Sequence, residues 1–156
     1  MPRRGKVAKR VVLPDSRYGS ALVTRVTKKV MKWGKKSKAE KIVYSALDLA
    51  AEELKKPQAD IMEQAIRNAT PLLQVKPRRV AGATYQVPVE VKGDRGSTLA
   101  IRWLLASARA RTGRSMAEKL AAELIDAFRG QGATIKRRED THRMAESNKA
   151  FAHFRW

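Results

Sequence analysis

Cysteine is absent from this chain of 156 residues, which excludes disulfide bonds, thiolate metal sites and cysteine nucleophiles. Histidine occurs only twice, and the motifs GxxxxGK[ST], GxGxxG, GxSxG and HExxH do not occur. No apolar run reaches the length of about 18 residues that a membrane-spanning helix needs, and no apolar stretch follows the basic N-terminus. These absences favour a non-enzymatic protein of the cytoplasm that has no cofactor, no metal and no small-molecule substrate.

Acidic residues are scarce as well. The chain has 15 Asp and Glu against 34 Lys and Arg, a formal net charge of +19. Such an excess repels itself within one globule and predicts an anionic partner, either nucleic acid or, as the alternative, a membrane surface. Residues 1–41 carry 14 basic and 2 acidic side chains, whereas residues 42–156 carry 20 and 13. This asymmetry favours a phosphate-binding surface over an ordinary solvated one.

Hydrophobic residues make up 43% of the chain, enough for one core, and only short breaks separate the periodic segments. We therefore expect a single domain over residues 1–156. Its predicted fold is mainly α, a bundle of about six helices with an inserted two-stranded β-hairpin arm and an extended basic N-terminal arm. Residues 1–18 form that arm, which we expect to order on a partner, with a solvated tail as the alternative. Residues 134–156 form a C-terminal helix and tail.

The hairpin is predicted over residues 72–91, where apolar and polar residues alternate on both sides of Gly82. Pro77 and Pro88 restrict the two strands to edge positions. The helices show a different periodicity, and their expected starts come from capping residues. These are Ser20, Ser37 with Glu40, the segment after Gly96, Ser115 with Glu118, and Thr134.

Basic side chains cluster at four places and are the candidate nucleic-acid contacts, because each phosphate they neutralise releases a counterion. On the first helix a basic stripe lies opposite an apolar one. The predicted contacts are Arg3, Arg4, Lys6, Lys9 and Arg10 in the arm, Arg25, Lys28, Lys29, Lys32, Lys35, Lys36 and Lys38 from the first helix onward, Lys76, Arg78 and Arg79 in the hairpin, and Arg95, Arg102, Arg109, Arg111 and Arg114 around the fourth helix. A solvated helix face and an ordinary exposed turn are the alternative interpretations.

Four other side chains are candidates for a functional role. Tyr85 is placed to stack on an unpaired base. Trp103 could stack in the same way, but its apolar stripe favours the core. His142 and Glu146 have the spacing of a metal-ligand or acid–base pair, yet without a third ligand an intrahelical pair or an RNA contact is preferred. A DNA-binding helix-turn-helix protein and a nucleic-acid-modifying enzyme remain the rival hypotheses for the chain as a whole.

Several stretches carry a resemblance to a known family. They are residues 18–20, 34–36 and 39–44, then 82–88, 100–104, 136–140 with 142–146, and 148–156. In these motifs, which span essentially the whole chain, the sequence resembles the small-subunit ribosomal protein seven family in its bacterial form. It departs from the family at Lys92 to Gly96, where relatives usually carry a proline and more arginine.

The resemblance implies a function and a set of partners. It implies a structural constituent of the small ribosomal subunit that binds the 3′ major domain of ribosomal RNA and nucleates assembly of the head. It implies a place near the transfer RNA exit site and the messenger RNA exit path, beside small-subunit proteins nine and eleven. The hairpin and the C-terminal helix are implied to face the transfer RNA, through Arg79, Val80, Gly82, Tyr85, Arg143 and Asn148.

Overall fold

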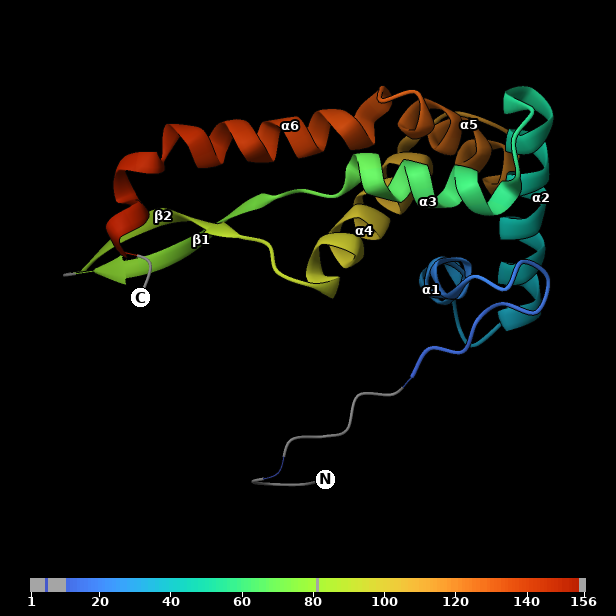
Figure 1. Cartoon of the computed structure of the whole chain (residues 1–156), viewed down its shortest axis with the longest axis horizontal. Helices are drawn as coiled ribbons and strands as arrows, with labels where there is room; N and C mark the ends of the chain where they lie inside the picture. Colours follow the sequence, from blue (N-terminus) through green and yellow to red (C-terminus); the bar gives the residue numbers. More distant parts are fainter. Residues whose placement is uncertain (1–4, 6–10, 81, 155–156) are drawn as a thin grey trace.

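The computed structural model describes residues 5, 11–80 and 82–154. Within these residues it contains six α-helices, a two-stranded antiparallel sheet and one 3-10 helix (Figure 1). In chain order the elements are α1 (Ala21–Val30), α2 (Lys36–Leu54), α3 (Gln58–Ala69), β1 (Leu73–Val80), β2 (Ala83–Glu90), α4 (Asp94–Ala110), α5 (Met116–Phe128), α6 (Gly132–Ser147) and the 3-10 helix η1 (Lys149–Phe154). The predicted helical bundle with an inserted hairpin is confirmed.

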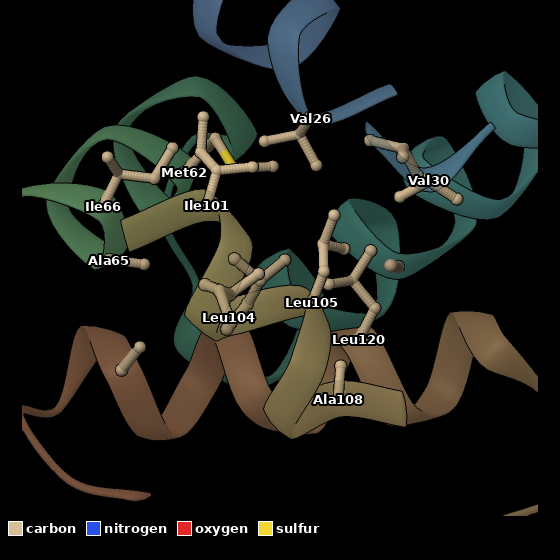
Figure 2. Close-up of a cluster of buried hydrophobic side chains, with 14 of the residues drawn as sticks. Val26, Val30, Met62, Ala65, Ile66, Ile101, Leu104, Leu105, Ala108 and Leu120 are labelled. Atoms are coloured by element: carbon tan, nitrogen blue, oxygen red, sulfur yellow. The ribbon is translucent and has the colours of Figure 1, made fainter. Parts of the chain in front are cut away.

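The helices form a bundle because each one buries a stripe of apolar side chains at helical spacing. On α1 this stripe is Val23, Val26 and Val30, which are all buried. Figure 2 shows buried side chains of α1, α3, α4 and α5 pointing toward one another. The helix α5 packs against α2, α3, α4 and α6 and is therefore the centre of the bundle. Trp103 on α4 is buried too, which confirms its interpretation as a core residue.

The hairpin pairs β1 with β2 from Leu73 opposite Glu90 to Val80 opposite Ala83. Neither strand has a second neighbour among the described residues, so both are edges and both tolerate their prolines. Figure 1 shows the hairpin extending from the bundle with α6 running alongside it. A hairpin of two strands is marginally stable alone, so this cover from α6 and η1 stabilises the arm.

The ring of Tyr85 lies on the covered side of the hairpin. Its centroid is 5.1 Å from that of Phe151 and 5.3 Å from that of Phe154, both in η1. Aromatic pairs at this separation stabilise a contact beyond the area they bury. The predicted role of Tyr85 as a stacking platform for an unpaired base stays a prediction, and in the structure the ring packs against the C-terminal segment.

The base of the hairpin is tied to the helices around it. The backbone N–H of Leu72 donates to His142 Nε2 of α6 at 3.0 Å, and Arg95 Nε of α4 donates to Gln74 Oε1 of β1 at 2.9 Å. The preferred interpretation of His142 as an intrahelical or RNA contact misses this role. These two bonds orient the arm relative to the bundle.

Three predicted helix starts are displaced. The helix α2 begins at Lys36 without a side-chain cap, so Ser37 lies inside its first turn. The helix α4 begins at Asp94, before Gly96 rather than after it. The helix α6 begins at Gly132, and the buried Thr134 bonds to Glu123 of α5 instead of capping. The cap predicted at Ser115 is confirmed, since its Oγ accepts from the N–H of Glu118 at 3.2 Å.

Gly96 lies inside α4 because the helix packs closely there. A Cβ atom at this position would lie 2.8 Å from Cγ2 of Thr70, a distance that real Cβ atoms do not reach. Close packing of α4 on the end of α3 thus requires a glycine. Within the described residues, none of the helices combines the length and the apolar character needed to cross a membrane.

Candidate nucleic-acid interface

The polar side of α1 lies against α4 and forms the first part of the candidate interface. Arg25, Lys28 and Lys29 line a shallow groove together with Thr98 and Ile101 of α4. Arg25 Nη1 lies 3.1 Å from Asp94 Oδ1. The carboxylate of Asp94 is 75% exposed, so this ion pair is weak and leaves the cation accessible to a polyanion.

A second groove continues from the C-terminal end of α1. Its cations are Lys32, Lys35 and Lys38 with Arg109 from the last turn of α4. Arg102, which is also exposed, precedes Arg109 by two helical turns and shares its side of α4. Helix packing thus gathers eight predicted contacts, which we call the α1–α4 face: Arg25, Lys28, Lys29, Lys32, Lys35, Lys38, Arg102 and Arg109.

Lys36 differs from its neighbours in the predicted cluster. Its Nζ lies 3.2 Å from Glu40 Oε1, one turn later on α2. It also lines a groove of mixed charge beside Asp15 and Glu40 rather than the groove of Lys35 and Lys38. The local potential around Lys36 is therefore less positive than that of the α1–α4 face.

Arg111 serves inside the protein. Its Nε donates to Glu123 Oε2 at 2.6 Å, and its Nη2 bonds to Asp126. Burial by itself would lower the pKa of Arg111, but hydrogen bonds to Asp126 and Glu123 outweigh it and raise the pKa, so the guanidinium stays charged. The RNA contact of Arg111 stays a prediction. Its structural role, holding Glu123 and Asp126 of α5, is seen in the hydrogen bonds. Arg114, three residues later, is exposed.

The hairpin carries three further predicted contacts away from the bundle. Lys76, Arg78 and Arg79 are exposed on β1, and Arg79 lies opposite Thr84 one pair from the end of the ladder. Figure 1 shows that this end of the arm is remote from α1. The interface therefore consists of two separate basic regions in the described residues, the α1–α4 face and the hairpin. The contacts predicted at Arg3, Arg4, Lys6, Lys9 and Arg10 lie outside the described residues.

The two predicted positions on the C-terminal side lie at the far end of α6 from the bundle core. Arg143 is exposed and lies 3.9 Å from Asp140 of its own helix. Asn148 follows the last turn of α6, and its side-chain N–H donates to the backbone carbonyl of Met144 at 2.7 Å. Val80 pairs with Ala83 at the end of the ladder, and Gly82 directly precedes Ala83. Each of these positions is on the arm or on the helix that accompanies it.

Sequence reasoning missed the attachment of the segment before α1. Asp15 accepts hydrogen bonds from the hydroxyl of Tyr44 at 2.8 Å and from the N–H of Arg17 at 3.1 Å. The hydroxyl of Tyr18 donates to Asp48 at 3.1 Å. The extended arm predicted over residues 1–18 therefore ends earlier than expected, because from Asp15 on the chain is bonded to α2. The tyrosine hydroxyls at 18 and 44 were the available signal.

Burial and these bonds change the acidity of both tyrosines. Burial, followed by the hydrogen bond to Asp48, raises the pKa of Tyr18 to about 12. Burial and the hydrogen bond to Asp15 raise the pKa of Tyr44. Both phenols therefore remain neutral donors at physiological pH, and the attachment persists there.

A helical bundle with a cationic face and a projecting basic ribbon is typical of proteins that bind the phosphate backbone of a nucleic acid. Comparison with known sequences identifies the family within this class. Residues 2–149 match the ribosomal protein S7p/S5e family. The small ribosomal subunit protein uS7 of Chloroflexus aggregans is 67% identical over 154 residues, which cover 99% of this chain and 98% of that protein.

More distant relatives agree. The small ribosomal subunit protein uS7 of Thermomicrobium roseum is 59% identical over 156 residues and that of Dehalococcoides mccartyi is 53% identical, in both cases over the full length of the two chains. The chain belongs to the ribosomal protein S7p/S5e family. It is a structural ribosomal protein of the small-subunit type and not an enzyme.

Proposed function

We propose that this protein binds the 3′ major domain of small-subunit ribosomal RNA directly and nucleates assembly of the head of the subunit. The observation that carries the proposal is the α1–α4 face, where seven of the eight cations, from α1, α2, α4 and the loop between α1 and α2, line two grooves. Such a surface matches the phosphates of folded RNA, and its density of positive charge exceeds what solubility requires. Membership of the family supports the same partner.

The proposed mechanism is a clamp that acts on RNA shape. The α1–α4 face holds phosphates of one RNA segment, while Lys76, Arg78 and Arg79 on the hairpin reach another. Because bonds at its base orient the arm, the two regions bind at a set separation and restrict how the RNA segments meet. The arginines and lysines before residue 11, together with Lys36, Arg95, Arg111 and Arg114, complete the proposed set of contacts.

Other partners follow from the position proposed for the arm. The hairpin end and the end of α6 would face the exit site for transfer RNA, near the path by which messenger RNA leaves. The proposed positions are Arg79, Val80, Gly82, Tyr85, Arg143 and Asn148. Small-subunit proteins nine and eleven are the proposed protein neighbours, and the proposed setting is the cytoplasmic ribosome of the bacterial type.

A salt titration of binding tests the clamp. If the protein neutralises roughly five phosphates, log affinity for a transcript of the 3′ major domain should fall with log salt at a slope of about −4. Duplex DNA of equal length serves as the competitor, because a helix-turn-helix protein would prefer it. A flat salt response, or displacement of the transcript by equimolar duplex DNA, would contradict the proposal.

Matched double variants locate the contact. Lys28→Gln with Lys29→Gln removes two charges from the α1–α4 face and should lower the salt slope by about 2. Lys55→Gln with Lys56→Gln removes two charges at the opposite end of α2, about 28 Å from its start by helical rise. This control should leave both slope and affinity within experimental error. Equal effects of the two pairs would show that total charge, and not the face, determines binding.

A further inference from the structure

Trp33 lies in the loop between α1 and α2 and has no place in the core. The residue is 90% exposed, the highest value among the large hydrophobic residues of the described chain. Tryptophan is usually largely buried, and a ring left in water adds nothing to folding and favours aggregation. Such an exposed ring is typical of a site that a binding partner covers.

The backbone at this ring adopts an uncommon conformation. Trp33 has φ of 52° and Gly34 has φ of 73°, so two consecutive residues lie in the left-handed region. The turn is closed by a hydrogen bond of 3.1 Å from the N–H of Lys35 to the carbonyl of Lys32. A non-glycine residue in this region is uncommon, and such residues cluster at binding sites.

The second groove of the α1–α4 face lies beside the ring. It has a volume of about 430 Å³, within the range of roughly 300–1,000 Å³ typical of ligand pockets. Trp33 itself lines the groove, and the other apolar lining residues are Val30, Met31, Ala39, Ile42 and Met116. No carboxylate lines it among the described residues, while Lys32, Lys35, Lys38 and Arg109 do. Lys35 Nζ lies 5.6 Å from the centroid of the Trp33 ring.

We propose that Trp33 stacks on an unpaired base of the bound RNA, whose flanking phosphates contact the lysines and the arginine of this groove. The proposal rests on the proposed function and names the chemistry that one part of the face recognises. A nucleotide has an aromatic base beside an anionic phosphate. The base fits the Trp33 ring, and the phosphate fits the neighbouring cations. A protein partner would have to supply an apolar anchor and several carboxylates at once.

The occupant has to be single-stranded RNA. Bases within a duplex are stacked on one another and show no free face, whereas loops and bulges present bases that aromatic side chains can cover. Stacking is tolerant of base identity because every base has a π-face. Trp33 therefore recognises that a nucleotide is unpaired, and it does so without adding charge to the interface.

The test uses the full chain and a transcript of the 3′ major domain in filter binding at several salt concentrations. Trp33→Ala should weaken binding about 5- to 140-fold at every salt concentration, with an unchanged slope, because the ring carries no charge. Trp33→Phe should stay within about threefold of the natural protein, since phenylalanine also stacks. Lys32→Gln should instead lower the slope by about 1.

Tryptophan fluorescence gives an independent readout. In a Trp156→Phe background the remaining tryptophans are Trp33 and the buried Trp103. Addition of the transcript should quench the emission, and this quenching should disappear when Trp33→Phe is added. Leu49→Ala, which truncates another exposed apolar side chain on α2, is the matched control and should change neither affinity nor quenching.

The outcomes separate this inference from the proposed function. If the natural protein binds the transcript weakly with a flat salt response, the proposed function fails. If it binds with a steep slope while Trp33→Ala binds equally well and no quenching occurs, the stacking is refuted and the function stands. If Trp33→Ala lowers the slope without any quenching, the loop only positions lysines, and the inference is overturned.

Discussion

Replacing Glu123 should destabilise the whole fold, because this carboxylate joins three helices at a point without solvent. Its side chain is fully buried. It accepts from Arg111 Nε at the end of α4 and from the N–H and the hydroxyl of Thr134 in α6. No other element supplies an acceptor to Thr134 among the described contacts. Glu123 therefore links α4 and α6 through α5.

The loss of folding free energy depends on which polar groups each substitution leaves without a hydrogen-bond partner. Removal of one partner of a buried ion pair costs about 3–5 kcal/mol. Arg111 is 29% exposed and keeps Asp126, so the lower end applies and Glu123→Ala should cost about 3 kcal/mol. Glu123→Gln keeps an oxygen for Thr134 but loses the charge and the acceptor for Arg111 Nε, because the amide nitrogen only donates. Since Arg111 keeps Asp126, a cost of about 1.5 kcal/mol is expected.

Urea unfolding monitored by circular dichroism measures both values. With a slope of about 2 kcal/mol per molar urea, the midpoint should fall by about 1.5 M for Glu123→Ala and about 0.7 M for Glu123→Gln. Glu118→Gln makes the same charge change at an exposed position on α5 and should shift the midpoint by less than about 0.3 M. A Glu123→Gln protein as stable as the Glu118→Gln control would refute the assigned role.

Three further predictions follow. Because the pKa of Tyr18 is raised to about 12, its contribution to folding stability is complete below pH 10 and disappears as the pH rises toward 12. An alkaline absorbance titration of Tyr18→Phe should show one fewer tyrosine that ionises at high pH. Gly96→Ala would place a Cβ atom 2.8 Å from Thr70, should cost about 1–3 kcal/mol and lower the midpoint of thermal unfolding. Tyr85→Ala removes the ring contacts with η1, so amide exchange in the hairpin should accelerate while α5 stays protected.

The cations of the α1–α4 face are close together and are partly neutralised by exposed ion pairs. Eight like charges on one side of a small bundle repel one another and lower its stability. The protein offsets part of this repulsion with exposed pairs such as Arg25 with Asp94, which are easily exchanged for phosphates. Arg111, in contrast, holds its carboxylates inside the bundle and serves the fold.

Local patterns in the sequence predicted the elements well. The alternation around Gly82 predicted a hairpin whose strands are now seen at Leu73–Val80 and Ala83–Glu90. The Ser115 cap was also correct, because the bond it makes spans only three residues. An error arose where a distant partner outweighs a local preference, since Thr134 bonds to Glu123 instead of capping a helix. The packing of Tyr85 on Phe151 is a distant contact of the same kind, which no local pattern indicates.

The sequence by itself determined the class of fold, the positions of most helices and the need for a polyanionic partner, because periodicity and net charge are properties of the chain read in order. Only the tertiary structure decided which cations act together. Arg25 and Lys32 share a face with Arg102 and Arg109 because α1 packs beside α4, about 70 residues later in the chain. That neighbourhood depends on burying Val26 and Val30 against α4 and α5, a choice that no local pattern contains.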